Sequence, residues 1–488
     1  MRLLHRSAVT QHLLPTIDEM VNAYLAKSHC STIQQEEYIL QMVKEKTAYA
    51  IFSHRWLDKG ELTFQDLSKL GSISVAGFRR LIESHHSELS VLCGTAILDQ
   101  AKVYGAEENI ERKGWEVLKE MQKICACMSD EARYASDFVK LVMFCEAASR
   151  HQCDFVWLDT GCIDKQSSAE LEESIRSMFS WYRNSKICIV HLSETIAPHS
   201  MGLDPWFTRG WTLQELLAPK AIKFFSKSWS PLTAKPNDKI PDLELGCPLW
   251  EIISNITQIP VDQLLNFEPG INSVSERMVW VSKRKTTRVE DMAYCLIGIF
   301  NVPLSIAYGE GRMAFHRLQV EIVQRSHDRG LFIWNGPNSS QSPLNSMFAA
   351  GPEAFKCESL LTEGEDMAGS ADPTYALTNY GLRILLSIYD VQHVEEQSKY
   401  VGWITYKLEV QELEDIRVEA EFLIKNEKLT IGILGNIPGD KSLAIVLIPL
   451  NIGSHQRQFK RITTNDVCKV IRQPRFKKWK EPELIFIE

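Results

Sequence analysis

The chain has 488 residues, enough for about three domains, each able to bury its own core. Its 44% hydrophobic and 24% charged residues are close to the averages of folded globular proteins, which excludes a wholly disordered, collagen-like or polytopic membrane protein. The 54 basic and 62 acidic residues give a net charge of −8, the wrong sign for a protein that coats nucleic acid, so we expect no nucleic-acid partner.

The cysteines and the longest apolar stretches bear on the cellular compartment. The twelve cysteines are scattered and form no CxxC pair, which predicts no metal site and reduced thiols in a cytosolic or nuclear setting. Of these two settings we expect the cytoplasm. The N-terminal residues contain no apolar run long enough for a signal peptide. The charge-free stretch from residue 292 to 309 is interrupted by Asn301, Pro303 and Ser305, so it predicts a buried helix that ends near Asn301 and no membrane span.

The first part of the chain predicts a helical lead-in, a strand and an insertion. The lead-in covers residues 1–45, because residues 33–46 are rich in Gln, Glu and Lys and carry a partial apolar stripe. Residues 49–53 form an apolar run before a polar loop, the profile of a buried strand that delivers a loop at its carboxyl end. Residues from about 84 to 132 are charged and only loosely periodic, and we interpret them as an insertion.

From Ser136 onward, helices and strands alternate. Apolar residues at helical spacing predict one helix after Ser136 and a second over residues 168–182. Short apolar runs predict three further strands, at residues 155–158, 187–192 and 222–225. Helices between strands imply parallel βαβ units, so the fold class is an α/β parallel sheet flanked by helices. Ligands of such sheets bind at the carboxyl edge of the strands.

The remaining sequence predicts two further regions beyond an α/β domain at residues 46–235. Residues 236–335 contain four segments of helical pattern, which indicate a helical extension of that domain. A stretch rich in Asn, Gly, Pro and Ser follows at residues 335–340 and predicts a linker. Residues 340–488 contain β-branched runs separated by turns, so we expect a β-rich C-terminal domain.

Four segments together resemble the HET domain, the heterokaryon-incompatibility domain of fungi. They are YAIFSHRW at residues 49–56, FVWLDTGCIDKQ at 155–166, SIRSMFSWY at 174–182 and WFTRGWTLQE at 206–215. The resemblance continues through residues 286–334. The sequence departs from the family at Gly161, where a cysteine is frequent, and in the long segment before Ser136.

The resemblance implies nonself recognition and cell-death signalling of an innate-immunity type in fungi. HET domains are in turn similar to TIR domains, several of which cleave NAD at the nicotinamide–ribose bond. TIR enzymes carry a catalytic glutamate on a helix after a strand, with a tryptophan four positions earlier. Trp211 and Glu215 have this spacing, which is about one helical turn. The resemblance therefore implies a TIR-like fold, NAD as a substrate, no tightly bound cofactor and Glu215 as the catalytic residue.

The chemistry of NAD cleavage suggests roles for the residues around Glu215. Breaking the nicotinamide–ribose bond builds an oxocarbenium-like centre, which a nearby carboxylate stabilises. Arg55 and Arg209 are candidate donors to the pyrophosphate. The other candidate NAD-binding residues are Trp211, which could stack on a ring, Asp159, which could hold a hydroxyl, and Trp56.

Structural alternatives stand beside these roles. Trp211 could fill the core, and Asp159 could cap the helix that follows it. Glu215 could form a buried ion pair with Arg209 or Arg55. Two mechanisms therefore stay open: an NAD hydrolase, and a non-enzymatic module that signals through assembly with protein partners or with itself. Convergence of Glu215, Arg55 and Asp159 at the sheet edge favours the hydrolase, and Glu215 in an ion pair favours the module.

Two further motifs carry weaker signals. Cys162 could act as a nucleophile with His191 or His54, but a buried thiol without a catalytic role is the stronger reading. The sequence GEGR at residues 309–312 is a glycine-rich turn before a helix, which by itself is weak evidence for a phosphate site.

Overall fold

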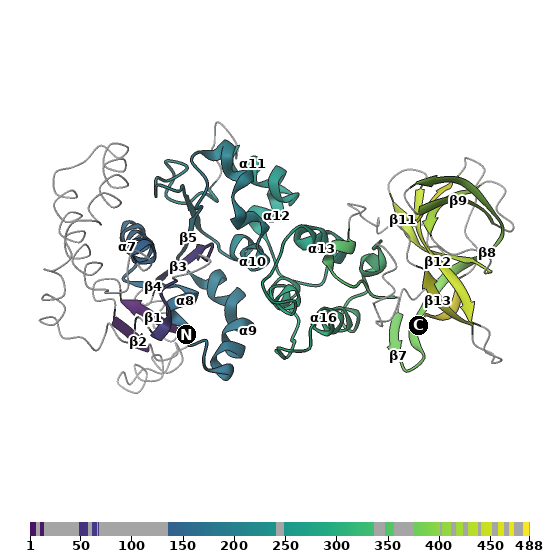
Figure 1. Ribbon diagram of the computed structural model, residues 1–488, viewed down its shortest axis with the longest axis horizontal. Helices are drawn as coiled ribbons and strands as arrows, with labels where there is room; N and C mark the ends of the chain where they lie inside the picture. The colour runs from purple at the N-terminus through teal and green to yellow at the C-terminus, as the bar shows by residue number, and fades with distance from the viewer. Residues whose placement is uncertain are drawn as a thin grey trace, which may run out of the picture. The chain divides into compact units, whose positions relative to one another are not determined.

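The computed structural model divides into two compact units, Met1–Glu268 and Pro269–Glu488. It describes residues 1–5, 10–13, 48–56, 61–65, 67, 135–240, 248–335, 347–355, 375–400, 403–410, 416–422, 428–437, 441–450, 457–462, 468–472 and 482–487 (Figure 1). The insertion predicted over residues 84–132 and the helical pattern at residues 33–46 lie outside these ranges.

The first unit is built on a six-stranded sheet with the strand order β2-β1-β4-β3-β5-β6. Four strands are parallel: β3 (Tyr49–His54), β4 (Phe155–Trp157), β5 (Ile187–His191) and β6 (Ile222–Phe225). They are the four predicted strands, and the prediction of one parallel sheet is confirmed. Their residues are almost all buried, because helices cover both faces of a parallel sheet.

The start of the chain corrects the prediction of a helical lead-in. Strands β1 (Arg2–His5) and β2 (Thr10–Leu13) form an antiparallel hairpin, and β1 pairs antiparallel with β4. Two runs of four residues are too short to show a period of two above chance, so the pattern gave no sign of them. Pairing with the edge of the parallel sheet supplies the stability that an isolated hairpin lacks.

The helices of the first unit divide between the two faces of the sheet (Figure 1). Helix α7 (Ala135–Arg150) covers one face, where Phe144 stacks on Phe52 with ring centroids 4.5 Å apart. Helices α9 (Ser168–Asn184) and α10 (Thr212–Leu217) cover the other, where Tyr182 meets the ring of Trp157 edge-on. Residue Ser53 lies between Phe52 and His54 in β3, so its side chain points to the α9 and α10 side. The other helices among the described residues of this unit are α8 (Asp159–Cys162), α11 (Pro248–Thr257) and α12 (Val261–Asn266).

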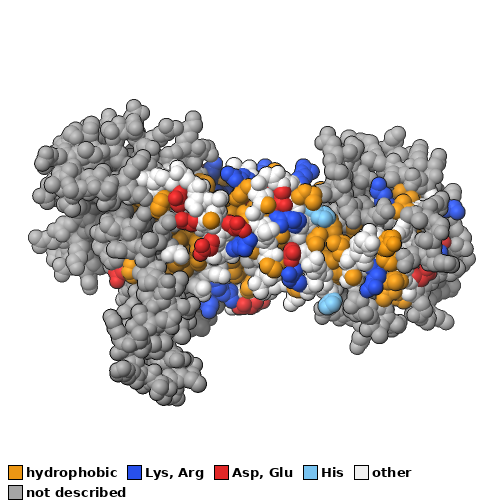
Figure 2. Space-filling view, turned by 90° about the horizontal axis from the view of Figure 1, so that it is seen from below, with side chains coloured by type: hydrophobic (Ala, Val, Ile, Leu, Met, Phe, Trp, Pro, Cys, Tyr) orange, Lys and Arg blue, Asp and Glu red, His pale blue; other side chains and the backbone are white. Residues whose placement is uncertain are grey.

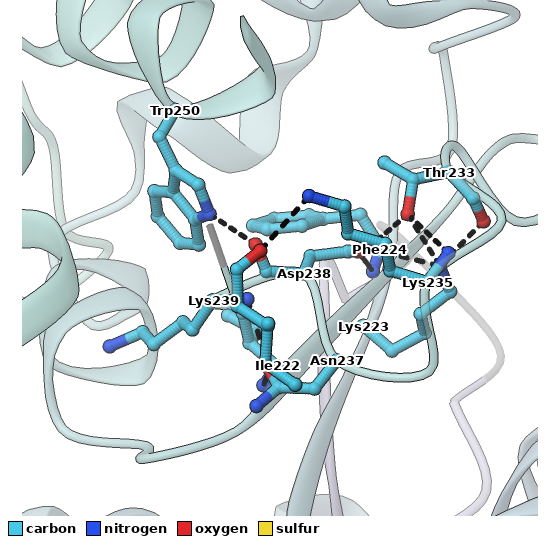
Figure 3. Close-up of polar contacts among 10 residues, drawn as sticks. Ile222, Lys223, Phe224, Thr233, Lys235, Asn237, Asp238, Lys239 and Trp250 are labelled. Carbon is cyan, nitrogen blue, oxygen red and sulfur yellow. Dashed lines mark hydrogen bonds and ion pairs between the residues drawn. The ribbon is translucent and has the colours of Figure 1, made fainter. Parts of the chain in front are cut away.

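A loop seals the outer edge of β6 (Figure 3). The backbone N–H groups of Ile222 and Phe224 donate to side-chain oxygens of Asn237 and Asp238, at 3.0 and 2.8 Å. The carbonyl groups of the same two strand residues accept from the backbone N–H groups of Asp238 and Leu232, at 2.8 and 3.0 Å. The outward polar groups of this edge strand are thus satisfied by a loop that is not itself a full strand.

The Asp238 side chain is held in turn by buried partners. Lys223 Nζ lies 3.0 Å from Asp238 Oδ1, and both side chains are almost fully buried. Thr233 donates to the same oxygen, and the indole of Trp250 in α11 donates to the Asp238 carbonyl at 2.5 Å (Figure 3). Because each group has a partner, this buried charge pair fixes the loop to the strand.

The second unit combines short helices with a nine-stranded, mostly antiparallel sheet. The helices are α13 (Val274–Ser282), α14 (Asp291–Tyr294), α15 (Ile297–Phe300), α16 (Met313–Val323) and the 3-10 turns η3 (Arg329–Phe332) and η4 (Pro352–Ala354). The strands are β7 (Tyr375–Thr378), β8 (Gly381–Tyr400), β9 (Trp403–Val410), β10 (Ile416–Phe422), β11 (Thr430–Ile437), β12 (Lys441–Leu450), β13 (Gln458–Ile462), β14 (Cys468–Arg472) and β15 (Glu483–Ile487). Strand β11 pairs with both β12 and β8, so the sheet closes on itself. The predicted β-rich C-terminal region is confirmed.

The division into units differs from the predicted boundary near residue 337. Arg461 of β13 donates to the carbonyl groups of Phe332 and Trp334, at 2.9 and 2.8 Å. Arg329 donates to the carbonyl groups of Leu434 and Leu385, at 3.3 and 3.2 Å. These guanidinium groups join the helical segment to the sheet, so the expected extension over residues 236–335 is shared between the units. A linker composition gives no sign of such long-range contacts.

The glycine-rich turn at residues 309–312 is filled by a side chain of the protein itself. Glu290 Oε1 accepts from the backbone N–H groups of Gly309 and Gly311, at 2.9 and 3.0 Å. Both glycines have positive φ, which lets the two N–H groups converge. The backbone N–H of Glu290 itself and these two donors lower the pKa of Glu290, so a carboxylate occupies the place where a phosphate would bind. Helix α15 ends at Asn301 in a left-handed conformation, close to the predicted end.

The described surface carries charges of both signs, and the described helices include no membrane span. Acidic and basic side chains are interspersed over the described part of the face drawn in Figure 2, which fits the modest net charge. Among the described residues, no helix combines the length and the apolar composition needed to cross a membrane.

Candidate active site at the carboxyl edge of the parallel sheet

The side chains of Ser53, Trp206 and Glu215 meet at the carboxyl end of β3. Ser53 donates a hydrogen bond to Glu215 Oε2 at 2.5 Å, and the indole N–H of Trp206 donates to the Ser53 hydroxyl at 2.8 Å. Ser53 and Trp206 are fully buried, whereas Glu215 is half-buried. The carboxylate is therefore held from the protein side by an uncharged hydroxyl group.

The loop between β5 and α10 gives Trp206 its position. It contains the 3-10 turns η1 (Pro198–Leu203) and η2 (Pro205–Thr208), with the buried Asp204 between them. Asp204 accepts from the backbone N–H groups of Glu194 and Trp206, at 2.9 and 3.0 Å, and from the Thr195 hydroxyl. Thr212 donates to the Trp206 carbonyl at 2.6 Å, so the loop is tied at both ends.

The electrostatic surroundings raise the pKa of Glu215 to about 7. Burial is the largest cause, and the negative charge of Asp159 adds to it. The hydrogen bond from Ser53, the charge of Arg209 and the nearby Tyr182 hydroxyl, which donates its proton to the Phe52 carbonyl, act in the opposite direction without cancelling the effect. Carboxyl groups with a pKa near neutrality are typical of functional sites, and the carboxyl edge of a parallel sheet is where ligands commonly bind.

Cationic side chains gather beside this carboxylate around Trp56. The Trp56 side chain is exposed, with Lys165 Nζ 3.5 Å from its ring centroid and Arg209 Cζ at 5.4 Å. Asp159 is the first residue of α8, and its charge acts on both Lys165 and Glu215. Two cations thus lie at one indole ring, and two carboxylates interact with them through charge. Such an arrangement is able to bind a ligand with phosphate and hydroxyl groups.

The structure brings together most of the predicted site residues. Glu215, Asp159, Arg209 and Trp56 belong to one electrostatic cluster. Trp211 precedes α10, half-buried, and its carbonyl accepts from the Glu215 N–H at 3.5 Å, so the expected spacing of one helical turn is present. Arg55 follows β3 in the chain and is half-buried.

The expected alternative of an ion pair at Glu215 is absent from the described residues. Neither Arg55 nor Arg209 forms a hydrogen bond or an ion pair with Glu215 there, although the charge of Arg209 acts on it. The hydrogen bond that holds Glu215 comes from Ser53, whose side chain carries no charge. This arrangement accounts for the raised pKa.

Sequence reasoning missed four residues of the cluster: Ser53, Lys165, Tyr182 and Trp206. All four lie within the segments that carry the family resemblance. A hydroxyl at the last buried position of a strand, directly before a polar loop, is the signal that could have pointed to Ser53. Tyr182 and Trp206 lie on apolar stripes, where an aromatic residue with a polar role looks like ordinary core.

A second polar cluster lies on the opposite face of the sheet. Glu61 contacts His54 Nε2 at 3.5 Å and Lys140 Nζ at 2.8 Å. Burial would raise the pKa of Glu61, but the hydrogen bonds and charges of His54 and Lys140 outweigh it and lower the pKa to about 2.

His191 stacks on Trp229, and burial lowers its pKa to about 3, so this imidazole is neutral. Cys162 is buried.

No group of three or more His, Cys, Asp or Glu side chains with the arrangement of a metal site occurs in the part of the chain that the structure describes. The groups available for a ligand at the sheet edge are therefore carboxylates, cations and an indole ring.

Comparison with known proteins identifies the α/β unit. Residues 138–204 match the family model described as "Heterokaryon incompatibility protein (HET)", so the chain contains a HET domain in this region. It is also similar to the vegetative incompatibility protein HET-E-1 of Podospora anserina, with 41% identity over 194 residues. That match covers 37% of this chain and 14% of the relative, so the chain spans only a small part of the relative's length.

No solved structure matches the chain. The family recognised from the four sequence segments is confirmed, and the likeness to TIR domains stays a prediction.

Proposed function

We propose that the chain acts in heterokaryon incompatibility, and that its HET domain does so by hydrolysing NAD at the Glu215 site. The first part is supported by the family match and by the relative's name. The second is supported by one observation above all: Glu215 is a half-buried carboxylate at the carboxyl edge of a parallel sheet, held by a hydroxyl and not neutralised by an ion pair with a described residue.

The proposed reaction adds water to the ribose carbon C1′ of NAD. The bond between C1′ and the nicotinamide nitrogen breaks, and its electron pair goes to that nitrogen, which leaves as neutral nicotinamide. The water oxygen bonds to C1′, and its proton passes to solvent, giving ADP-ribose. The ionised Glu215 stabilises the positive charge that develops on the ribose. Arg209, Lys165 and Arg55 supply charge for the pyrophosphate, and Asp159 supplies an acceptor for a ribose hydroxyl.

The pKa of Glu215 gives this reaction a distinctive pH profile. Only the ionised carboxylate stabilises the developing charge, and about half of the molecules carry it at a pH equal to the pKa. With a pKa of about 7, nicotinamide release should rise with pH between about 6 and 8 and then level off.

The test is nicotinamide release from NAD by the purified full chain and by E215Q. Glutamine keeps the shape and loses the charge, and we expect a loss of at least about a hundredfold, or roughly 3 kcal/mol in the barrier. The matched control is E172Q, on the exposed face of α9, where Glu172 pairs with Arg176. An unchanged rate in E215Q, or no release by the wild-type chain, would contradict hydrolysis at this site.

A second candidate function, a non-enzymatic module that signals by self-association, is favoured by one other observation. Ile196 and Leu203 are 80% and 84% exposed on a loop whose backbone is fixed by Ser200 and Asp204. A rigid loop that presents large apolar side chains to water is typical of a contact surface. If wild-type protein releases no nicotinamide and sediments as an oligomer that an I196K/L203K variant breaks, this function replaces the hydrolase.

A further inference from the structure

The direction of the hydrogen bonds at Ser53 is fixed by chemistry. The Trp206 indole N–H can only donate, so the Ser53 oxygen must accept from it. A serine hydroxyl has one proton, and the Glu215 carboxylate is the acceptor within reach of it, at 2.5 Å. Trp206 therefore leaves Ser53 a single useful orientation, with the O–H directed at Glu215 Oε2.

The Trp206 indole is itself held on several sides. Its backbone N–H is bound by Asp204 and its carbonyl accepts from Thr212, while its ring meets Phe207 and Phe224 edge-on. The whole side chain is excluded from solvent. If the Ser53 side chain changed rotamer, its oxygen would leave the indole N–H unpaired in the core, which is costly, so the oxygen stays beside the carboxylate.

We propose that Ser53 is a positioning residue for Glu215: its hydroxyl, oriented by Trp206, holds the carboxylate in one direction at the carboxyl edge of the sheet. Its catalytic consequence rests on the proposed function. The placement of Glu215 itself does not, and it is measurable without any substrate.

The proposal predicts the direction in which the titration midpoint of Glu215 shifts when the Ser53 hydroxyl is removed. The groups that act on it are Asp159 from α8, Arg209 after η2 and Tyr182 from α9, while the thiol of Cys188 in β5 approaches its carbonyl. All of these stay in place when the Ser53 hydroxyl is removed. The hydrogen bond favours the ionised form, so its loss in S53A should raise the titration midpoint of Glu215 by about one pH unit.

The same shift has a consequence for the proposed reaction. A rise of one unit from a pKa of about 7 lowers the ionised fraction at pH 7 from about a half to about a tenth. Nicotinamide release by S53A should then fall about fivefold at pH 7 and recover toward pH 9, with the loss in kcat and not in KM. A residue with only a structural role would not move the pH profile.

The experiment uses the full chain labelled with carbon-13 at the glutamate carboxyl groups. The Glu215 signal is assigned by its absence in E215Q and is titrated in wild type, S53A and W206F. The W206F variant keeps Ser53 and Glu215, and it keeps the measurement possible if S53A folds poorly. We expect an upward shift in both variants, larger in S53A. An unchanged midpoint in S53A, or in W206F where S53A does not fold, would overturn the proposal.

The matched control is S226A. Ser226 directly follows β6 at the same edge of the sheet and is equally buried, but its hydroxyl bonds to Ser228 and Ser230. This variant makes the same chemical change away from Glu215, and we expect no shift. If the wild-type chain releases no nicotinamide, the proposed function fails, while the titration still decides the role of Ser53.

Discussion

Ser53 and His54 are neighbours in β3, yet their side chains lie on opposite faces of the sheet beside two carboxylates that behave in opposite ways. Ser53 offers Glu215 a hydroxyl, and the pKa of Glu215 is raised to about 7. His54 and Lys140 together offer Glu61 hydrogen bonds and positive charge, and the pKa of Glu61 is lowered to about 2. Burial alone therefore does not decide the state of a carboxylate at this edge, because the partner does.

When it is ionised, Glu61 stabilises the folded protein, whereas Glu215 destabilises it. The charged Glu61 forms an ion pair with Lys140 and so links α7 to the loop after β3. The charge of Glu215 is left without a cation in contact among the described residues, and it costs stability whenever it forms. A group that is kept at a cost is more readily explained by function than by folding.

The largest expected effect on stability is that of E61Q. Because the folded pKa of Glu61 is below the ordinary value, its contribution is complete above about pH 4.5 and is lost as the pH falls toward 2. E61Q should therefore unfold about 3 kcal/mol more easily at pH 7, measured by denaturant titration. The control is E146Q, which changes a more exposed pair within α7. Equal stability of E61Q and wild type would show that the charge pair contributes nothing.

The second largest expected effect is that of E215Q, which should raise the free energy of unfolding. The folded pKa of Glu215 is raised, so its contribution is complete below about pH 4.5 and is lost as the pH rises through 7. E215Q cannot ionise, and at pH 8 it should be more stable than wild type by about 2 kcal/mol, with the difference vanishing at pH 4. Denaturant titrations at both pH values measure it. A less stable E215Q at pH 8 would mean that the Glu215 charge has an attractive partner.

The smallest effect is that of Y182F. The Tyr182 hydroxyl donates to the Phe52 carbonyl at 2.8 Å, and the ring packs against Trp157. Phenylalanine keeps the packing and loses the hydrogen bond, so we expect a loss of about 1 kcal/mol in thermal unfolding. The control is Y380F, at an exposed tyrosine of the second unit. A loss as large as that of E61Q would place Tyr182 among the main supports of the fold.

The sequence predicts the parallel sheet well because its strands are buried on both faces and read as continuous apolar runs. It does not predict the β1–β2 hairpin, whose strands have four residues each, nor the division at Glu268, which depends on contacts between distant segments such as Arg461 and Phe332. The spacing of Trp211 and Glu215 locates the site. The only partners that the sequence suggests for Glu215, as an alternative to catalysis, are Arg55 and Arg209, because charge is visible in a sequence and the direction of a serine side chain is not.

The loop that covers β6 limits how this protein can grow into larger assemblies. Asn237 and Asp238 fill the hydrogen-bonding positions that the next strand of a continuous sheet would occupy. A second molecule cannot add its own strand there unless the Lys223–Asp238 pair is first pulled out of the core. A contact between copies of this chain at this end of the sheet would have to be made by side chains, and a fibre of continuous backbone hydrogen bonds cannot begin from β6 as it is folded here.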